Sequence, residues 1–302
     1  MTNNLSGKKA VIDLGTNTFH LLAVEIDENE QMHFLFRERI FVKLAEDGIQ
    51  SIGPAPFQRA IKAMTVFKNK LDELGIDHFK AFGTAALRTA TNGPDLIHAI
   101  KEKTGIVVAL IDGLEEARLI HLGVSQAVPF DHTKQLIMDI GGGSVEFVIA
   151  NKEEVFWSGS FMVGVGVLYN RFHNSDPIAA TEIDAIRHYL DETLVPLKVW
   201  LDKEQIPILT GASGAFETIL DLMEHEKVNE EFAILDVEKF PQLYQKIIQT
   251  TLDDRRTMPS IPLERVEMIV VSVILVKWIL DHSNIEKIYV SAYALKEGML
   301  VD

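Results

Sequence analysis

The chain carries one short motif twice, as Asp13-Leu-Gly-Thr-Asn-Thr18 and as Asp139-Ile-Gly-Gly-Gly-Ser144. Both copies follow the pattern Asp-apolar-Gly-x-x-Ser/Thr, and each stands between two apolar segments that predict β-strands. The copies lie about one domain length apart in a chain of 302 residues, a length that suits two domains. Two unrelated glycine-rich hairpin turns would also explain the motif, because such turns are common. The matching strand context favours an internal repeat.

The segments around the two motifs predict a mixed α/β fold. In the first half, the sequence predicts strands at 8–14, 19–26, 32–42, 78–83 and 106–111, with helices at 57–74, 95–103 and 114–127. In the second half it predicts strands at 135–140, 145–150, 155–162, 206–210 and 287–291, and helices at 181–201, 216–224, 240–250, 263–281 and 294–300. The least regular stretch is 226–236. The apolar run 269–280 is too short to cross a bilayer and predicts a buried helix.

Each repeated turn has the residue types that hold phosphate groups. Glycine allows the backbone to approach a ligand closely and to turn its N–H groups inward. The hydroxyl groups of Thr16, Thr18 and Ser144 add donors, and Asp13 and Asp139 at the strand ends can hold water on a hard divalent cation. Two such hairpins facing each other would clamp a phosphate chain. Neither turn fits a P-loop or a Rossmann turn, because neither GxxxxGK[ST] nor GxGxxG occurs in the chain.

Composition narrows the classes of partner. The net charge is −15, and no Lys/Arg-rich block is present, which argues against a nucleic-acid-binding protein. Cysteine is absent, so a disulfide framework, a thiolate zinc site and a cysteine nucleophile are excluded. The N-terminus has no apolar stretch typical of a signal peptide. We therefore expect a cytoplasmic protein that binds neither DNA nor a membrane.

Six motifs now stand in order along nearly the whole chain: 13–20, 83–88, 115–120, 139–146, 211–214 and 295–298. With them the sequence resembles the exopolyphosphatase/guanosine-pentaphosphate phosphohydrolase (Ppx/GppA) family. The resemblance implies two ribonuclease-H-like domains of the actin/sugar-kinase superfamily, at 1–125 and 126–302, around an interdomain cleft. It also implies that the last helix packs on the first domain. The sequence departs from the family pattern at Thr16, Thr18 and Lys296, where serine, serine and arginine are usual.

The resemblance assigns roles to individual residues. Glu116 becomes the catalytic base, although a Glu pair that merely favours the helix dipole is the plain alternative. Arg88 becomes a bidentate phosphoryl contact, with a surface ion pair as its alternative. Arg118 is left open between a phosphate contact and an ion pair. The residues expected to bind phosphate are Gly15, Thr16, Asn17, Thr18, Gly141, Gly142, Gly143, Ser144, Gly211, Ser213 and Gly214. The expected metal ligands are Asp13, Asp139 and Glu146.

For Gly211-Ala-Ser-Gly214 an ordinary strand-to-helix turn is an equal explanation, and for Glu146 ordinary strand polarity suffices. The resulting hypothesis is hydrolysis of the terminal phosphoanhydride of inorganic polyphosphate with Mg²⁺, or Mn²⁺ in its place. Hydrolysis of guanosine pentaphosphate is the nearest alternative. An ATP-dependent kinase and a non-catalytic sensor on the same fold are more distant ones. Longer family members carry further helical domains, so we expect this chain to release long polyphosphate between cuts unless a homodimer supplies a groove.

Overall fold

The computed structural model describes residues 7–29 and 31–302, and it contains two mixed sheets. The strand order is β3-β2-β1-β4-β5 in one sheet and β10-β11-β12-β9-β6-β7-β8 in the other. In each sheet three antiparallel strands are followed by parallel ones: β1 pairs with β4 as β6 pairs with β9. The same order twice defines two ribonuclease-H-like halves, and the predicted fold class is confirmed. The boundary at residues 125 and 126 stays a prediction, and residues 1–6 lie outside the described part.

The first half supplies the elements β1 to α4. They are β1 (Gly7–Leu14), β2 (Thr18–Ile26), β3 (Met32–Phe41), α1 (Pro54–Leu74), β4 (Phe79–Gly83), α2 (Ala85–Thr89), α3 (Gly93–Thr104), β5 (Ala109–Leu110) and α4 (Gly113–Ala127). Helix α1 begins with a proline in its first turn and ends at Gly75, whose φ of 65° suits a residue without a side chain. Its buried residues recur at helical spacing and face the sheet: Ala60, Ala63, Met64, Phe67 and Leu71.

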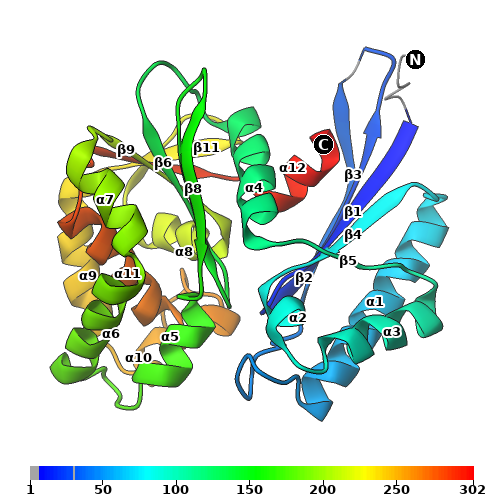
Figure 1. The fold of residues 1–302 in the computed structure, drawn as a ribbon, viewed down its shortest axis with the longest axis horizontal. Coiled ribbons are helices and arrows are strands. Elements are labelled where there is room, and N and C mark those ends of the chain that lie inside the picture. Colours follow the sequence, from blue (N-terminus) through cyan, green and yellow to red (C-terminus); the bar gives the residue numbers. More distant parts are fainter. Residues whose placement is uncertain (1–6, 30) are drawn as a thin grey trace.

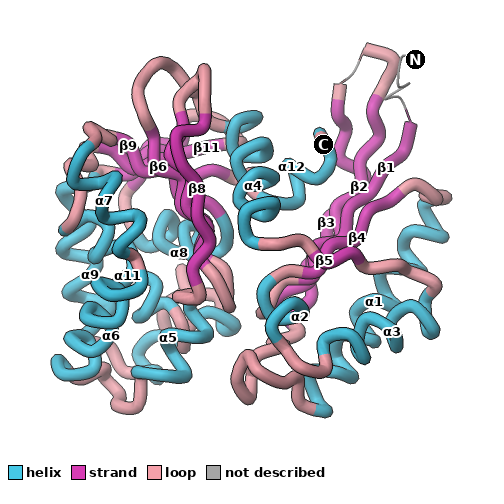
Figure 2. Tube along the Cα trace, in the orientation of Figure 1, coloured by secondary structure: helices cyan, strands magenta, loops and turns pink. Residues whose placement is uncertain are grey.

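The second half begins with a sheet that helices cover. Its first elements are β6 (Gln135–Ile140), β7 (Val145–Ala150), β8 (Val155–Phe161), α5 (Val165–Phe172), α6 (Ala180–Thr193), α7 (Val195–Lys203), β9 (Ile208–Ala212) and α8 (Ser213–Leu222). The remaining ones are β10 (His225–Lys227), β11 (Phe232–Leu235), η1 (Val237–Lys239), α9 (Phe240–Ile248), α10 (Leu252–Arg256), η2 (Leu263–Arg265), α11 (Ile269–Asp281), β12 (Lys287–Ser291) and α12 (Leu295–Val301). Figure 2 shows the two groups of strands with helices on their faces.

Several details differ from the sequence-based expectation. The helix expected at 263–281 is divided into the 3-10 helix η2 and helix α11, and the strand expected at 106–111 is reduced to the two residues of β5. The helix expected at 181–201 is two helices, because Leu194 leaves helical geometry and Pro196 starts the next helix without an N–H to continue the first. The stretch 226–236, expected to be irregular, forms most of β10 and β11, which extend the sheet beyond β12. Arg88 lies in the short helix α2, which the sequence analysis did not predict.

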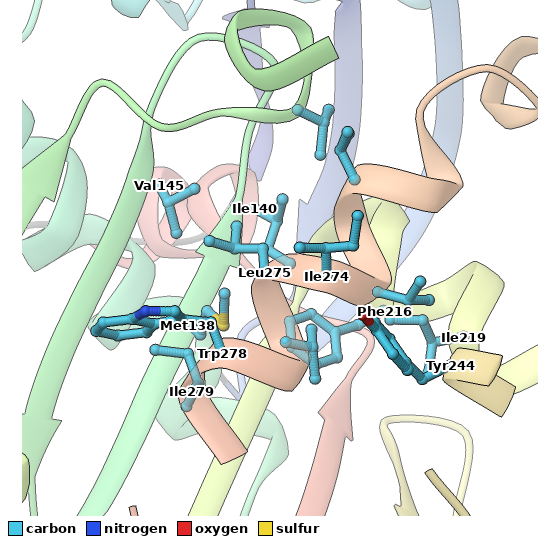
Figure 3. Close-up of a cluster of buried hydrophobic side chains, with 14 of the residues drawn as sticks. Met138, Ile140, Val145, Phe216, Ile219, Tyr244, Ile274, Leu275, Trp278 and Ile279 are labelled. Carbon is cyan, nitrogen blue, oxygen red and sulfur yellow. The ribbon is translucent and has the colours of Figure 1, made fainter. Parts of the chain in front are cut away.

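Helix α11 forms the core of the second half. Ten of its residues are buried, among them Leu275 and Trp278, which confirms the predicted buried helix. Figure 3 shows these side chains near Met138 and Ile140 of β6. A helix that is apolar on all sides is stable only inside a core or a membrane. Within residues 7–29 and 31–302, no helix is both long and apolar enough to cross a membrane.

Helices α4 and α12 lie between the two sheets (Figure 1). Their backbones touch: a Cβ added to Gly298 would lie 1.8 Å from the Leu119 carbonyl oxygen, and one added to Gly123 would lie 2.0 Å from that of Ala294. Helix α12 also contacts β1. Because α4 begins beside Glu116 and α12 begins beside Lys296, this crossing fixes two charged side chains relative to both sheets.

Candidate active site

The two copies of the repeated motif form turns of the same geometry. The Gly15 N–H donates to Thr18 O at 3.1 Å, and the Gly141 N–H donates to Ser144 O at 3.0 Å. In both turns a Cβ on the glycine would lie 2.8 Å from that same acceptor oxygen. The shared glycine is therefore needed to close the turn, and the sequence repeat is a structural repeat.

The two turns meet at a cavity of about 200 Å³ between the sheets. Most of the predicted site residues line it: Asp13, Gly15, Thr16, Asn17, Thr18, Glu116, Asp139, Gly141, Gly142, Gly143, Ser144, Glu146, Ser213 and Gly214. Arg88 and Gly211 do not. The turns also touch each other, since a Cβ on Gly142 would lie 2.6 Å from Asn17 Nδ2. Gly142 thus permits the close approach of the opposite turn.

Strand register places three side chains in a row on each sheet. In the first sheet Asp13 lies opposite His20, and His20 lies opposite Arg39. In the second, Asp139 lies opposite Glu146, and Glu146 lies opposite Ser160. Directly opposite residues point to the same face of a sheet. The two rows therefore start from the repeated aspartates and differ in their other two members, which are a histidine and an arginine in one row and a glutamate and a serine in the other.

Burial raises the pKa of the three carboxyl groups that were predicted to hold a metal. The pKa is about 7 for Asp13, about 6 for Asp139 and about 7 for Glu146, and the nearby Asp139 adds to the shift at Asp13 and Glu146. Among the described residues nothing donates to Asp13 Oδ1, a buried oxygen. Such carboxylates are costly to ionise unless a cation is present.

A magnesium ion fits these donors. Mg²⁺ prefers oxygen, keeps several waters and is usually held by one or two carboxylates together with substrate phosphates. The unpartnered Asp13 oxygen and the neighbouring Asp139 offer that donor set. Within the described residues, no group of three or more His, Asp or Glu side chains could hold a metal ion by itself. The arrangement suits an ion shared with substrate and not a closed structural site.

Glu116 stands at the beginning of α4, where Asp112 caps the helix by accepting from the N–H groups of Leu114 and Glu115 at 3.0 and 2.8 Å. The side chain of Glu116 is 9% exposed. Burial, and next the charge of Glu146, raise its pKa well above the usual value, while Arg88 lowers it. The Glu115 side chain, in contrast, is exposed and binds Arg118.

Arg88 supports Glu116 from outside the cavity wall. Its Nη1 lies 3.4 Å from Glu116 Oε2 and donates to the Ile111 carbonyl oxygen at 2.6 Å. The structure thus shows a contact of Arg88 with the carboxylate, and its direct contact with a phosphoryl group stays a prediction. Arg118, left open by the sequence, is an exposed ion pair with Glu115 and Asp302.

The segment Gly211–Gly214 divides into two parts. Gly211 lies inside β9, and a Cβ there would lie 2.1 Å from the Phe216 ring, so this glycine serves packing between β9 and α8. Ser213, which has a φ of 70°, donates from its hydroxyl to Ile140 O at 3.1 Å. A Cβ on Gly214 would lie 2.2 Å from Arg265 Nη2, so the arginine lies directly against this backbone.

Sequence reasoning missed much of the basic side of the cavity. The charged or titratable residues that also line it are His20, Arg39, Lys43, Glu217, Glu264, Arg265 and Lys296. His20 is kept neutral, because burial and then the charges of Lys296, Arg39 and Arg265 lower its pKa to about 3. Side chains on a strand alternate between its two faces, so a known pairing of the strands that carry His20 and Arg39 would have placed both residues on the face of Asp13. The sequence did not reveal the register of that pairing.

Two ribonuclease-H-like halves that carry the repeated turns at a shared cavity define the fold class of the actin/sugar-kinase proteins. The Ppx/GppA phosphatase family matches residues 23–302, and the chain belongs to that family. An exopolyphosphatase from Cytophaga hutchinsonii is 37% identical, with 97% of this chain and 96% of that chain covered and a TM-score of 0.92.

The chain is also similar to two more distant members of this family. A guanosine-5'-triphosphate,3'-diphosphate pyrophosphatase from Photobacterium profundum is 25% identical over 301 residues, which cover 99% of this chain. The chain spans 60% of the length of that relative. The Ppx/GppA family member from Aquifex aeolicus is 20% identical, with 98% of this chain and 96% of that chain covered and a TM-score of 0.80. The Aquifex likeness supports the fold.

Proposed function

We propose that this protein hydrolyses the terminal phosphoanhydride of inorganic polyphosphate and releases orthophosphate. The observation that carries the proposal is Glu116, a buried carboxylate beside Arg88 and near Glu146, at the wall of a cavity built from two phosphate-type turns. The similarity to an exopolyphosphatase over nearly the whole chain supports this substrate.

In this mechanism Glu116 accepts a proton from the attacking water and orients it in line with the terminal phosphorus. Arg88 holds the Glu116 carboxylate in place and keeps it ionised when substrate excludes water. The backbone N–H groups and hydroxyls of the two turns bind the non-bridging oxygens. When bound at Asp13 and Asp139, Mg²⁺, or Mn²⁺ in its place, would supply charge to the phosphates. Phosphoryl transfer asks chiefly for positioning and charge stabilisation, which these residues provide.

Guanosine pentaphosphate is the second candidate substrate. The similarity to the Photobacterium pyrophosphatase favours it, and its 5'-triphosphate ends in the same phosphoanhydride. The two candidates differ in what must fit behind the cleaved group: a further run of phosphates, or a guanosine with a 3'-diphosphate. Arg39 and Arg265, which line the cavity, would bind the anionic oxygens of either the further phosphates or the 3'-diphosphate.

The test is orthophosphate release with Mg²⁺ from long polyphosphate, short polyphosphate, guanosine pentaphosphate and ATP in parallel. Turnover of polyphosphate above that of guanosine pentaphosphate supports the proposal. The reverse order assigns the pentaphosphate. Consumption of ATP only in the presence of an acceptor would instead indicate a kinase. Tight binding without release from any of the four would indicate a sensor.

We also propose a cytoplasmic location and a homodimer. The absence of cysteine suits a reducing compartment and supports the location. A dimer would place a second subunit beside the cleft to extend the path of a long chain. Sedimentation analysis with and without long polyphosphate tests the assembly, and a monomer under both conditions would contradict it.

A further inference from the structure

Two arginines from opposite sides of the cavity bind the same carboxylate oxygen. Glu217 Oε2, on α8, accepts from Arg265 Nη2 at 2.9 Å and lies 3.5 Å from Arg39 Nη1. Arg39 belongs to β3 of the first sheet, whereas Arg265 belongs to η2 of the second half. All three residues line the cavity that contains Glu116. One carboxylate thus joins the two halves of the molecule across the cleft.

The arrangement contributes little to stability. The side chains of Glu217 and Arg39 are 48% and 47% exposed, and exposed ion pairs contribute about 0–1 kcal/mol. Arg265 is better fixed: it is 19% exposed, donates to Thr218 Oγ1 at 2.9 Å and lies against Gly214. The cation is therefore held in place, while the carboxylate is half in solvent and free to leave.

The position of the pair suits the distal part of a phosphate chain. Arg39 is third in the row that begins with Asp13 and His20, two strand spacings away, or about 10 Å. Two arginines against one carboxylate leave a positive excess, to which Lys296 adds and from which Glu264 subtracts. A phosphate group carries more charge than a carboxylate and presents more oxygens to two guanidinium forks.

We propose that Glu217 occupies, in the free protein, an anion position formed by Arg39 and Arg265, and that distal phosphate groups of the substrate displace it. This inference rests on the proposed function of the cavity and adds a specificity-determining residue to it. Ligands with phosphates beyond the cleaved group displace Glu217 and bind both arginines in its place. Ligands too short to reach Arg39 leave the carboxylate where it is.

The test compares binding of inorganic tetrapolyphosphate and pyrophosphate, by calorimetry in EDTA. Glu217→Gln is expected to bind tetrapolyphosphate up to about fivefold more tightly than the wild type, the factor that corresponds to the upper end of about 1 kcal/mol for an exposed ion pair. Its affinity for pyrophosphate is expected to stay within about twofold. Arg39→Gln is expected to bind tetrapolyphosphate more weakly. With Mg²⁺, the gain in Glu217→Gln is expected in KM and not in kcat.

Glu46→Gln is the matched control, since Glu46 pairs with Arg59 and neither residue lines the cavity, so the variant makes the same charge change without freeing a cation of the cavity. An equal gain in that variant, or no gain in Glu217→Gln, would overturn the proposal. Guanosine pentaphosphate and GTP distinguish the source of the displacing group: a gain for the pentaphosphate alone assigns the 3'-diphosphate, and a gain for tetrapolyphosphate assigns the chain. Because binding is measured without turnover, failure of hydrolysis in the wild type is a separate result.

Discussion

Arg88 Nη1 lies 3.4 Å from Glu116 Oε2, and the same nitrogen donates to the Ile111 carbonyl oxygen just before α4. The Arg88 guanidinium therefore links the Glu116 carboxylate to the backbone just before α4, the helix that carries Glu116. This relationship connects α2, which follows β4, to the beginning of α4. In the proposed mechanism, Arg88 is therefore a positioning residue for Glu116.

Arg88→Ala is expected to lower kcat by about tenfold to a hundredfold, because it removes a charge-assisted contact of about 1.5–3 kcal/mol. Arg88→Lys is expected to recover part of the loss, since a lysine keeps the positive charge but does not place its ammonium where the guanidinium holds Nη1. Steady-state orthophosphate release from tetrapolyphosphate measures both variants. Arg118→Ala, which removes an exposed arginine of the same helix as Glu116, is the control. Equal activity of Arg88→Ala and Arg118→Ala would show that Arg88 is a surface charge.

Gly298→Ala is expected to destabilise the fold by about 1–3 kcal/mol or more, the range for overpacking. The added methyl group would lie 1.8 Å from the Leu119 carbonyl oxygen, so α12 must move away from α4. Urea unfolding measures the loss, and Val301→Ala, at an exposed position of the same helix, should change little. An unchanged midpoint for Gly298→Ala would mean that α4 and α12 are not packed as closely as described.

The raised carboxyl pKa values predict an unusual dependence of stability on pH. Without metal, Asp13 releases its proton near pH 7 in the folded state but near pH 4 in the unfolded chain. The folded protein then binds more protons between these values, so its free energy of unfolding falls as pH rises from about 5 to 7. Each such group contributes up to about 1.4 kcal/mol per pH unit. Urea midpoints in EDTA measure this slope.

Magnesium should oppose that loss, because it binds the ionised carboxylates. The stabilisation by Mg²⁺ is therefore expected to grow between pH 5 and 7, and Asp13→Asn should remove most of the growth. Asp27→Asn, at an exposed carboxylate that bonds to His33, serves as the control. A stabilisation by Mg²⁺ that is independent of pH would argue against a site at Asp13 and Asp139.

Local patterns in the sequence were sufficient for most of the fold. The repeated Asp-apolar-Gly turn located the hairpins β1–β2 and β6–β7, and apolar spacing located α1 and α11. The break at Leu194 was missed because the amphipathic pattern continues across it. The strands β10 and β11 were missed because they are short and their pairing with β12 is not encoded locally.

The site could be predicted where residues that act together are also adjacent in the sequence, as in the two turns and the pair Glu115-Glu116. The sequence alone could not predict that His20, Arg39 and Glu217 line the same cavity. Their proximity to Asp13 depends on the register of three strands and on the approach of α8 from the other half. For the same reason Gly211 was assigned to phosphate, although it does not line the cavity and a Cβ there would meet Phe216.

The account depends most on Glu116 acting as the base. Single-turnover release of orthophosphate from tetrapolyphosphate, with Mg²⁺ and excess enzyme, tests this directly for the wild type, Glu116→Gln and Glu115→Gln. Glu116→Gln is expected to fold, to bind the substrate and to be at least about a hundredfold slower, the lower end of what a general base contributes. Glu115→Gln, next in sequence but exposed, should be within about twofold of the wild type. A loss of less than about fivefold in Glu116→Gln, or an equal loss in both variants, would contradict the account.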